Sequence, residues 1–306
     1  MKKLLITLGL VSTVVSSVKA QVYINELMAN APGADLPKEL FELRGTPNLS
    51  LAGYYLLSLE GQVAGNPGDI NNLFNLGSFS LGANGYLVGI ENNSTYTPIA
   101  SGATVLQNTV GDSWGSAATG TAGHQGDNAT GTVALENSAV TFLLINIGSG
   151  AAPSVTDDFD LDNDGTLDAL PTGWTLLDSI GLLDSVTALA TDVSYGAITF
   201  RLGTVGAETT PNVVQVPGTG TALYVGRKGE STGSTSADWF GAVPSGSGPT
   251  MTLGNSTDSF YNGKTLADMQ FGGVNPIPEP STWALLGLGL AGLGIRQIRK
   301  FPSLKR

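Results

Sequence analysis

Residues 140–147 read VTFLLINI, a run of mostly apolar side chains without a charge. A strand with one solvated face alternates apolar and polar residues. A continuous apolar run of this length is instead typical of a strand that is buried on both faces. We therefore expect residues 140–147 to form a central strand of a β-sheet.

Shorter segments of strand character lie on both sides of this run and are separated by turn residues. They are VYINELM at 22–28, LFELRG at 40–45, LSLAGYYLLSLEG at 49–61, 85–90, 174–183, 197–202, 222–225 and 251–253. The chain has 42 glycines and only 13% charged residues, a composition typical of many short strands joined by turns. The sequence predicts an all-β fold over residues 21–275.

Four of the front segments follow a recognisable pattern. They are Ile24-Asn25-Glu26-Leu27, Glu39-Leu40-Phe41-Glu42-Leu43, Leu51-Ala52-Gly53-Tyr54-Tyr55-Leu56 and Gly85 to Val88. This pattern resembles the start of the lamin tail domain, which also occurs in many bacterial exported proteins. The chain departs from that family at Arg44-Gly45, where an aromatic residue followed by Asn is common. The resemblance implies an immunoglobulin-like β sandwich with long loop insertions, and no binding surface is carried over from it.

Residues 92–132 are almost wholly polar. We expect a long loop or insertion here, in which Val105 and Leu106 are the one apolar pair that docks on the body. A second insertion is expected at 157–171, which is rich in Asp. The sequence leaves open whether residues 133–275 form a domain of their own.

The N-terminus has the organisation of a secretory signal peptide. Lys2 and Lys3 precede an apolar stretch at 4–15, and Val18-Lys19-Ala20 is a small-x-small site. We expect residues 1–20 to be removed by signal peptidase between Ala20 and Gln21. An uncleaved N-terminal anchor is the alternative.

The C-terminus, residues 276–306, begins with three spaced prolines and ends with a basic segment at 296–306. Between them, Trp283 to Ile295 is an apolar run of 13 residues. A helix that crosses a bilayer needs about 20 apolar residues, so this run predicts a transmembrane helix of marginal length that serves as a temporary anchor. A buried C-terminal helix is the alternative.

This order of elements resembles the PEP-CTERM sorting signal. Its parts are matched by Pro278, Glu279 and Pro280, by the apolar run, and by the basic end that starts at Arg296. The resemblance implies export by a Gram-negative bacterium and transient anchoring in the inner membrane. It also implies recognition by an exosortase-type enzyme, removal of the tail, and release to the cell surface or extracellular polymer.

Without these two ends, residues 21–275 carry six basic residues against 24 acidic ones, a formal charge of −18. Such a body repels phosphates and attracts cations, so we expect no nucleic-acid partner. The chain contains no cysteine, and an exported protein of this sequence must fold without disulfides.

The sharpest local motif is DFDLDNDGTLDALP at 158–171. Its Asp residues and glycine fall at positions 1, 3, 5, 6 and 9 of a calcium loop, and the position-7 residue offers its carbonyl. The predicted ligands are Asp160, Asp162, Asp164, Thr166 and Asp168. Pro171 stands where an EF-hand has Glu, which favours a looser loop completed by Asp157, Asp158 or Asp178. We expect structural Ca²⁺ here, with a solvated acidic turn as the alternative.

Catalytic constellations are weak in this sequence. His124 is the single histidine, and neither a GxSxG motif nor a cysteine accompanies it. Two of the residues Glu26, Glu39 and Glu42 could act as acid and base. We expect them instead to occupy ordinary strand and turn positions. We expect a protein that is not an enzyme.

The aromatic residues offer one alternative function. Trp114, Trp174, Trp239, Tyr54, Tyr55, Tyr86 and Tyr96 could form a sugar-stacking face, although core packing is the more common role of such residues. The favoured hypothesis is an exported structural or adhesive protein of the cell surface or extracellular matrix. The alternatives are a carbohydrate-binding module that holds extracellular polysaccharide and a secreted hydrolase.

Overall fold

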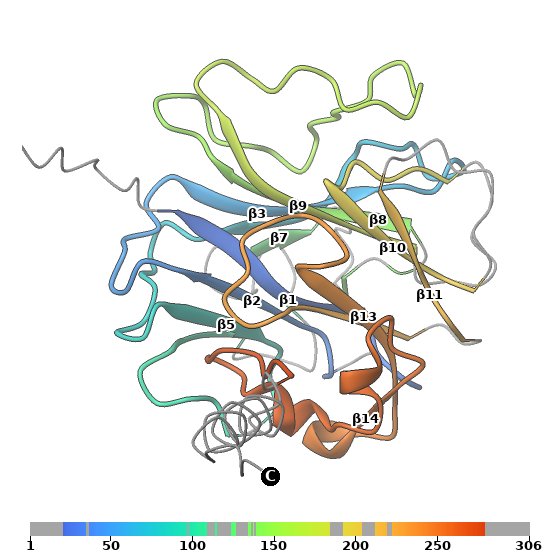
Figure 1. Ribbon diagram of the computed structural model, residues 1–306. Helices are drawn as coiled ribbons and strands as arrows, with labels where there is room; N and C mark the ends of the chain where they lie inside the picture. The colour runs from blue at the N-terminus through green and yellow to red at the C-terminus, as the bar shows by residue number, and fades with distance from the viewer. Residues whose placement is uncertain are drawn as a thin grey trace, which may run out of the picture.

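The computed structural model describes residues 21–34, 37–96, 98–108, 114, 124–126, 134–135, 137, 139–183, 192–203, 212–218 and 222–278. These residues form two β-sheets (Figure 1). The first contains β1 (Val22–Asn30), β2 (Leu40–Gly45), β5 (Tyr86–Ile90), β6 (Thr104–Gln107), β12 (Leu223–Arg227), β13 (Trp239–Ser245) and β14 (Thr252–Gly254). The second contains β3 (Tyr54–Glu60), β4 (Ile70–Asn75), β7 (His124–Gly126), β8 (Ala139–Asn146), β9 (Thr175–Leu183), β10 (Ile198–Leu202) and β11 (Val213–Val216). The strand orders are β14-β13-β12-β1-β2-β5-β6 and β11-β10-β9-β8-β3-β4-β7.

The prediction for VTFLLINI is confirmed. Strand β8 lies inside the second sheet between β3 and β9, and both of its faces are covered. Val140, Phe142 and Leu144 belong to the core shared by the two sheets, whereas Leu143 and Ile145 belong to an outer apolar cluster. The alternation of a strand therefore divides one continuous apolar run between two separate cores.

The outer face of each sheet is covered by connecting segments. On the first sheet, the chain after β13 forms three short 3₁₀ helices, η1 (Gly248–Thr250), η2 (Ser259–Tyr261) and η3 (Leu266–Met269). Their apolar side chains pack against Tyr224 and Phe240 of that sheet. On the second sheet, the yellow-green loop between β8 and β9 in Figure 1 contributes Phe159 and Trp174 to an outer apolar cluster that includes Leu143.

A buried ion pair joins the two sheets. Arg227 of β12 donates from Nη2 to Asp178 Oδ2 of β9 over 2.6 Å, and the two side chains are 0% and 3% exposed. The same carboxylate oxygen accepts the backbone N–H of Ile24 in β1, and Arg227 Nε donates to the Ile24 carbonyl. Burial raises the pKa of Asp178, and the guanidinium opposes that rise. Strands from both sheets thus meet at one charged contact.

The predicted immunoglobulin-like, lamin-tail-like topology is wrong. The chain is all-β, and the four front segments are strands β1, β2, β3 and β5, as predicted. However, the described chain forms two sheets of seven strands, and β9, β10 and β11 are paired in parallel one after the other. An immunoglobulin-like sandwich is antiparallel and has seven to nine strands in total. Successive parallel strands give the fold the character of a β-solenoid instead.

The polar segment 92–132 is not a simple loop. Residues 104–107 form β6, which pairs in parallel with β5, and Leu106 is fully buried while Val105 is 41% exposed. Residues 124–126 form β7 beside β4. The predicted signal peptide at 1–20 and the predicted helix at 283–295 lie outside the described residues. Within the described part of the chain, no helix has the length and apolar character needed to cross a membrane.

Candidate functional site

The Asp-rich loop brings three of its predicted ligands together. One carboxylate oxygen from each of Asp160, Asp162 and Asp164 lies within 4.8 Å of the others. Asp162 and Asp164 are exposed, whereas Asp160 is fully buried. The loop turns through Asn163 and Gly165, whose φ angles are 53° and 81°, in the region that favours Asn and Gly. Carboxylate oxygens at this spacing are suited to a hard cation.

The Asp160 carboxylate holds the loop together by accepting three hydrogen bonds. Its Oδ1 accepts the backbone N–H of Asp164 at 3.0 Å, and its Oδ2 accepts the N–H of Gly165 at 2.9 Å. Oδ2 also accepts the hydroxyl of Tyr195 at 2.7 Å. Burial, together with the nearby carboxylates, raises the pKa of Tyr195, so its hydroxyl remains a donor. Asp160 is therefore a structural residue of the loop as well as a potential ligand.

The loop is attached to the connection between β3 and β4. Phe159 N–H donates to the Gly68 carbonyl at 3.0 Å, and Ile70 N–H donates to the Asp157 carbonyl at 3.2 Å. A side chain at Gly68 would place its Cβ 2.6 Å from both Asp158 Oδ1 and the Asp160 nitrogen. The glycine thus permits a close approach of the two segments.

The remaining predicted ligands have other roles. Asp168 Oδ2 accepts the Leu161 N–H at 3.0 Å, so this carboxylate closes the loop. Thr166 N–H donates to Asp164 Oδ1 at 2.7 Å. Asp157 Oδ2 accepts the Ser154 N–H at 2.9 Å. Asp178 forms the ion pair with Arg227 between the sheets.

His124 lies in a buried aromatic cluster. It is 3% exposed, its ring centroid is 4.5 Å from that of Phe74 and 6.5 Å from that of Trp114, and Nε2 lies 3.0 Å from Asn72 Oδ1. Burial lowers the pKa of His124 to about 4, so the imidazole is neutral at physiological pH. These contacts make it a core residue.

Glu26 and Glu42 do form a pair. They face each other across β1 and β2, and both are fully buried. Burial raises the pKa of Glu26 to about 8. Burial, together with the neighbouring charge of Glu26, raises that of Glu42 well above its usual value. Asn25 Nδ2 and Gly272 N–H donate to Glu42 at 2.6 and 2.5 Å. This pair is part of the packing between the first sheet and the C-terminal segment.

Glu39 is separate from that pair. Its Oε2 accepts the indole N–H of Trp114 and the backbone N–H of Leu135, each at 2.8 Å. It therefore fixes two residues of the polar region between β6 and β8 onto the body.

Most of the aromatic residues considered for a sugar-stacking face have the expected role of core packing. Trp114, Trp239 and Tyr96 are at most 1% exposed, and Tyr55 is 6% exposed. Trp114 stacks on Phe41 with a ring-centroid distance of 5.4 Å. Most of these aromatic residues are therefore core residues.

The chain stays attached to the body up to the start of the predicted sorting signal. Asn84 Nδ2 donates to the Gly272 carbonyl at 2.7 Å, and Asn275 Nδ2 donates to the Arg227 carbonyl at 2.9 Å. The hydroxyl of Tyr261 donates to the Pro276 carbonyl at 2.7 Å. Pro276 is thus bound to the body. Pro278 is the last described residue, and Gln21 is the first; Ala20, Glu279, Pro280 and Arg296 lie outside the described residues.

Comparison with known proteins identifies the C-terminal segment. Residues 276–300 match the PEP-CTERM protein-sorting motif. No curated protein and no solved structure matches the chain, and the lamin tail resemblance gains no support. The motif indicates an exported protein that passes the membrane on its way to the cell surface and is processed by an exosortase-type enzyme.

Proposed function

We propose that the chain is a non-enzymatic structural or adhesive protein of the cell surface or extracellular matrix. The observation that carries this proposal is the sorting motif at 276–300, joined directly to a body that is hydrogen-bonded through Pro276. The burial of His124 in an aromatic cluster also favours a role without catalysis. A body packed on both faces of both sheets is suited to persist outside the cell without disulfides.

Replacing Pro278, Glu279 and Pro280 by Ala tests the route. The expected result is an uncleaved precursor in the inner-membrane fraction, because the processing enzyme no longer recognises its site. Immunoblots with an antibody to the body and with a C-terminal tag distinguish the precursor from the mature form. The variant Asp162→Ala is the control and should be exported normally. Export and trimming of the triple variant at the wild-type level would contradict the proposal.

We propose in addition that the Asp-rich loop binds Ca²⁺ as a structural ion. The convergence of Asp160, Asp162 and Asp164 supports this proposal. So does the strong negative charge of the body, which raises the local concentration of cations. A bound ion would offset the repulsion between the three carboxylates and hold the loop against the β3–β4 connection.

Calcium should raise the melting temperature of the exported protein. An ion at about 100 times its dissociation constant stabilises the folded state by about 2.7 kcal/mol, which corresponds to a shift of roughly 5 °C or more for a domain of this size. The double variant Asp162→Ala/Asp164→Ala should lose this shift. Its melting temperature without calcium should be close to the wild-type value, since both side chains are exposed. If millimolar Ca²⁺ leaves the melting temperature of the wild-type protein unchanged, the proposed calcium site is ruled out.

A further inference from the structure

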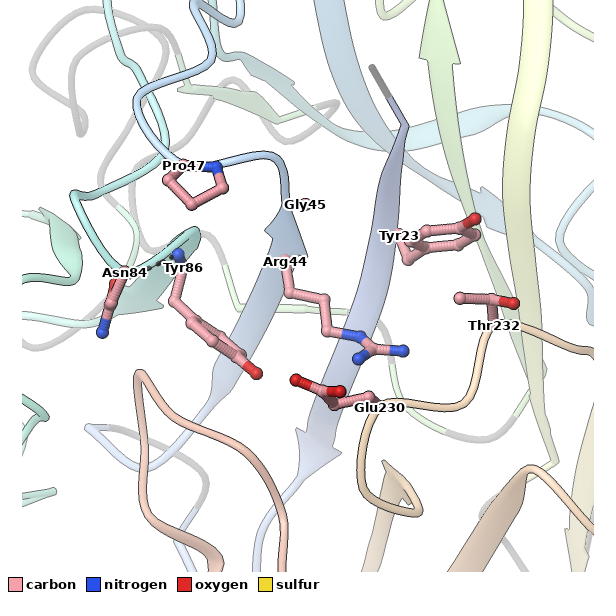
Figure 2. A pocket seen from close by; sticks show the side chains of 8 residues that line it. All are labelled: Tyr23, Arg44, Gly45, Pro47, Asn84, Tyr86, Glu230 and Thr232. Carbon is pink, nitrogen blue, oxygen red and sulfur yellow. Dashed lines mark hydrogen bonds between the residues drawn. The ribbon is translucent and has the colours of Figure 1, made fainter. Parts of the chain in front are cut away.

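A pocket of 260 Å³ opens at one end of the first sheet (Figure 2). It is lined by residues of β1, β2 and β5, by the turns beside them, and by the connection between β12 and β13. These residues are Tyr23, Arg44, Gly45, Pro47, Asn84, Tyr86, Glu230 and Thr232. Figure 2 shows Arg44 in the middle, with Tyr86 on one side, Tyr23 on the other and the Glu230 carboxylate beside the guanidinium. None of these residues belongs to the Asp-rich loop or to the sorting motif.

Arg44 is an unusual residue for a pocket in so acidic a body. It is 7% exposed, and Nη2 donates to the Ser231 carbonyl. Its Nε makes no hydrogen bond to any residue that the structure describes. A buried donor without a partner costs free energy, and a guanidinium presents a fixed fork of donors that suits pairs of oxygen atoms. Because Arg44 also lines the pocket, its guanidinium is available to the oxygen atoms of a ligand there.

The aromatic wall of the pocket is held in place. The Tyr23 ring centroid lies 5.8 Å from the Arg44 guanidinium and 5.3 Å from that of Arg227. Tyr86 is 7% exposed and forms a hydrogen bond with Arg44. Two phenol rings fixed by cations and hydrogen bonds present apolar faces with little loss of conformational entropy on binding.

The charges of the lining residues define the class of ligand. Arg44 and Glu230 carry opposite charges, and the hydroxyl of Thr232 adds both a donor and an acceptor. An anionic ligand would meet the Glu230 carboxylate and a body of strong negative charge, whereas an apolar ligand would offer no oxygen to the remaining donors of Arg44. A neutral ring with many hydroxyl groups can form hydrogen bonds with Arg44, Glu230 and Thr232, and its apolar face can lie against a tyrosine ring. The volume is just below the roughly 300–1,000 Å³ of sites for larger ligands, which limits the occupant to about one ring.

We propose that this pocket binds one sugar ring of a neutral glycan, with its hydroxyl groups on Arg44, Glu230 and Thr232 and its apolar face on a tyrosine. The proposal concerns binding alone and does not depend on the sorting motif or on calcium. Failure of either of those proposals would leave it unaffected.

Isothermal titration calorimetry of the mature protein with cellobiose, maltose and lactose tests the proposal, with digalacturonate as an acidic probe. We expect at least one neutral disaccharide to bind with a dissociation constant of about 1 mM or below. Glu230→Ala and Thr232→Ala should each weaken that binding, and the two together should weaken it at least about tenfold. Glu230 and Thr232 are exposed, so their variants should keep the wild-type melting temperature. Thr175→Ala changes an exposed residue that does not line the pocket, so it is the matched control and should bind as the wild type does.

The absence of binding to all three neutral disaccharides would overturn the proposal. So would binding that the Glu230 and Thr232 variants leave unchanged, because the sugar would then occupy another site. Binding of digalacturonate without binding of a neutral sugar would show that the ligand is an anion, contrary to the proposal.

Discussion

Replacing Arg227 by Met lowers the free energy of unfolding by about 3–5 kcal/mol, because it leaves the buried Asp178 carboxylate without its cation. Arg227 also donates from Nη1 to the Gly233 carbonyl at 2.6 Å and lies 4.4 Å from the Trp239 ring centroid. The substitution therefore removes contacts to both sheets at once. Urea unfolding followed by tryptophan fluorescence measures the change.

The neighbouring Lys228 provides the control. Lys228 Nζ lies 2.9 Å from Asp258 Oδ2, but the two side chains are 19% and 25% exposed. Pairs of this kind contribute at most about 1 kcal/mol, so Lys228→Met should have a small effect. The double variant Asp178→Asn/Arg227→Met should recover part of the loss, because it removes the uncompensated charge. A loss in Arg227→Met no larger than that in Lys228→Met would contradict the assigned role of the ion pair.

The loss should also depend on pH. Burial raises the pKa of Asp178 above the value of 3.8 expected for an unfolded chain, and the guanidinium limits that rise. Without Arg227 the folded-state pKa rises further. A carboxyl group with a raised folded-state pKa reduces stability as pH rises above its unfolded-state pKa. The loss in free energy of unfolding caused by Arg227→Met should therefore be smaller near pH 4 than at pH 7.

Strands with a local apolar signal could be predicted from the sequence. VTFLLINI is strand β8, and the predicted strand at 174–183 is β9. Strand β4 is not predictable over its full length because its sequence, INNLFN, contains three Asn residues. Asn72 is only 1% exposed, and its partners are His124 and the Ala134 carbonyl, both more than 50 residues away. A local pattern contains no information about such partners.

Strand β13 was missed for a different reason. It contains Gly241 and Pro244, which are typical of turns. A Cβ at Gly241 would lie 2.7 Å from Phe200 and Val216 of the other sheet, so the glycine is required by the approach of the two sheets. The strand order was not predictable either, because it depends on contacts between residues that are far apart in the sequence. Strand β1 pairs with β12, about 200 residues later, and nothing in a single sequence specifies that pairing.

In the candidate sites, too, features that depend on nearby residues could be predicted, and features that depend on distant residues could not. The convergence of Asp160, Asp162 and Asp164 follows from their spacing, because alternate residues of a tight loop point to one centre. The role of Asp178 was misjudged, since its partner Arg227 is 49 residues away. The pocket around Arg44 was missed because its residues come from distant strands. In the sequence, Arg44 stands out only as a departure from the lamin tail pattern.

Replacing Glu26 by Gln should make the protein more stable at pH 8 and remove much of its sensitivity to pH. Glu26 faces Glu42 in a region that also contains Tyr224, Tyr261 and Arg44, and its pKa is raised from 4.5 to about 8. Between these two values the unfolded chain loses a proton that the folded chain retains. Stability therefore falls as pH rises, by up to about 1.4 kcal/mol per pH unit. Gln has nearly the same shape and does not ionise, so the variant avoids this loss.

The expected gain is about 2 kcal/mol or more at pH 8, with little difference from the wild type at pH 4.5. Urea unfolding across this pH range measures it. Glu230→Gln, which changes an exposed residue, is the control and should follow the wild-type curve. Parallel loss of stability in wild type and Glu26→Gln would show that Glu26 does not hold the proton. Gly272 donates to Glu42, and Asn275 lies beside Glu26, so this buried pair contacts the segment that leads into the sorting motif.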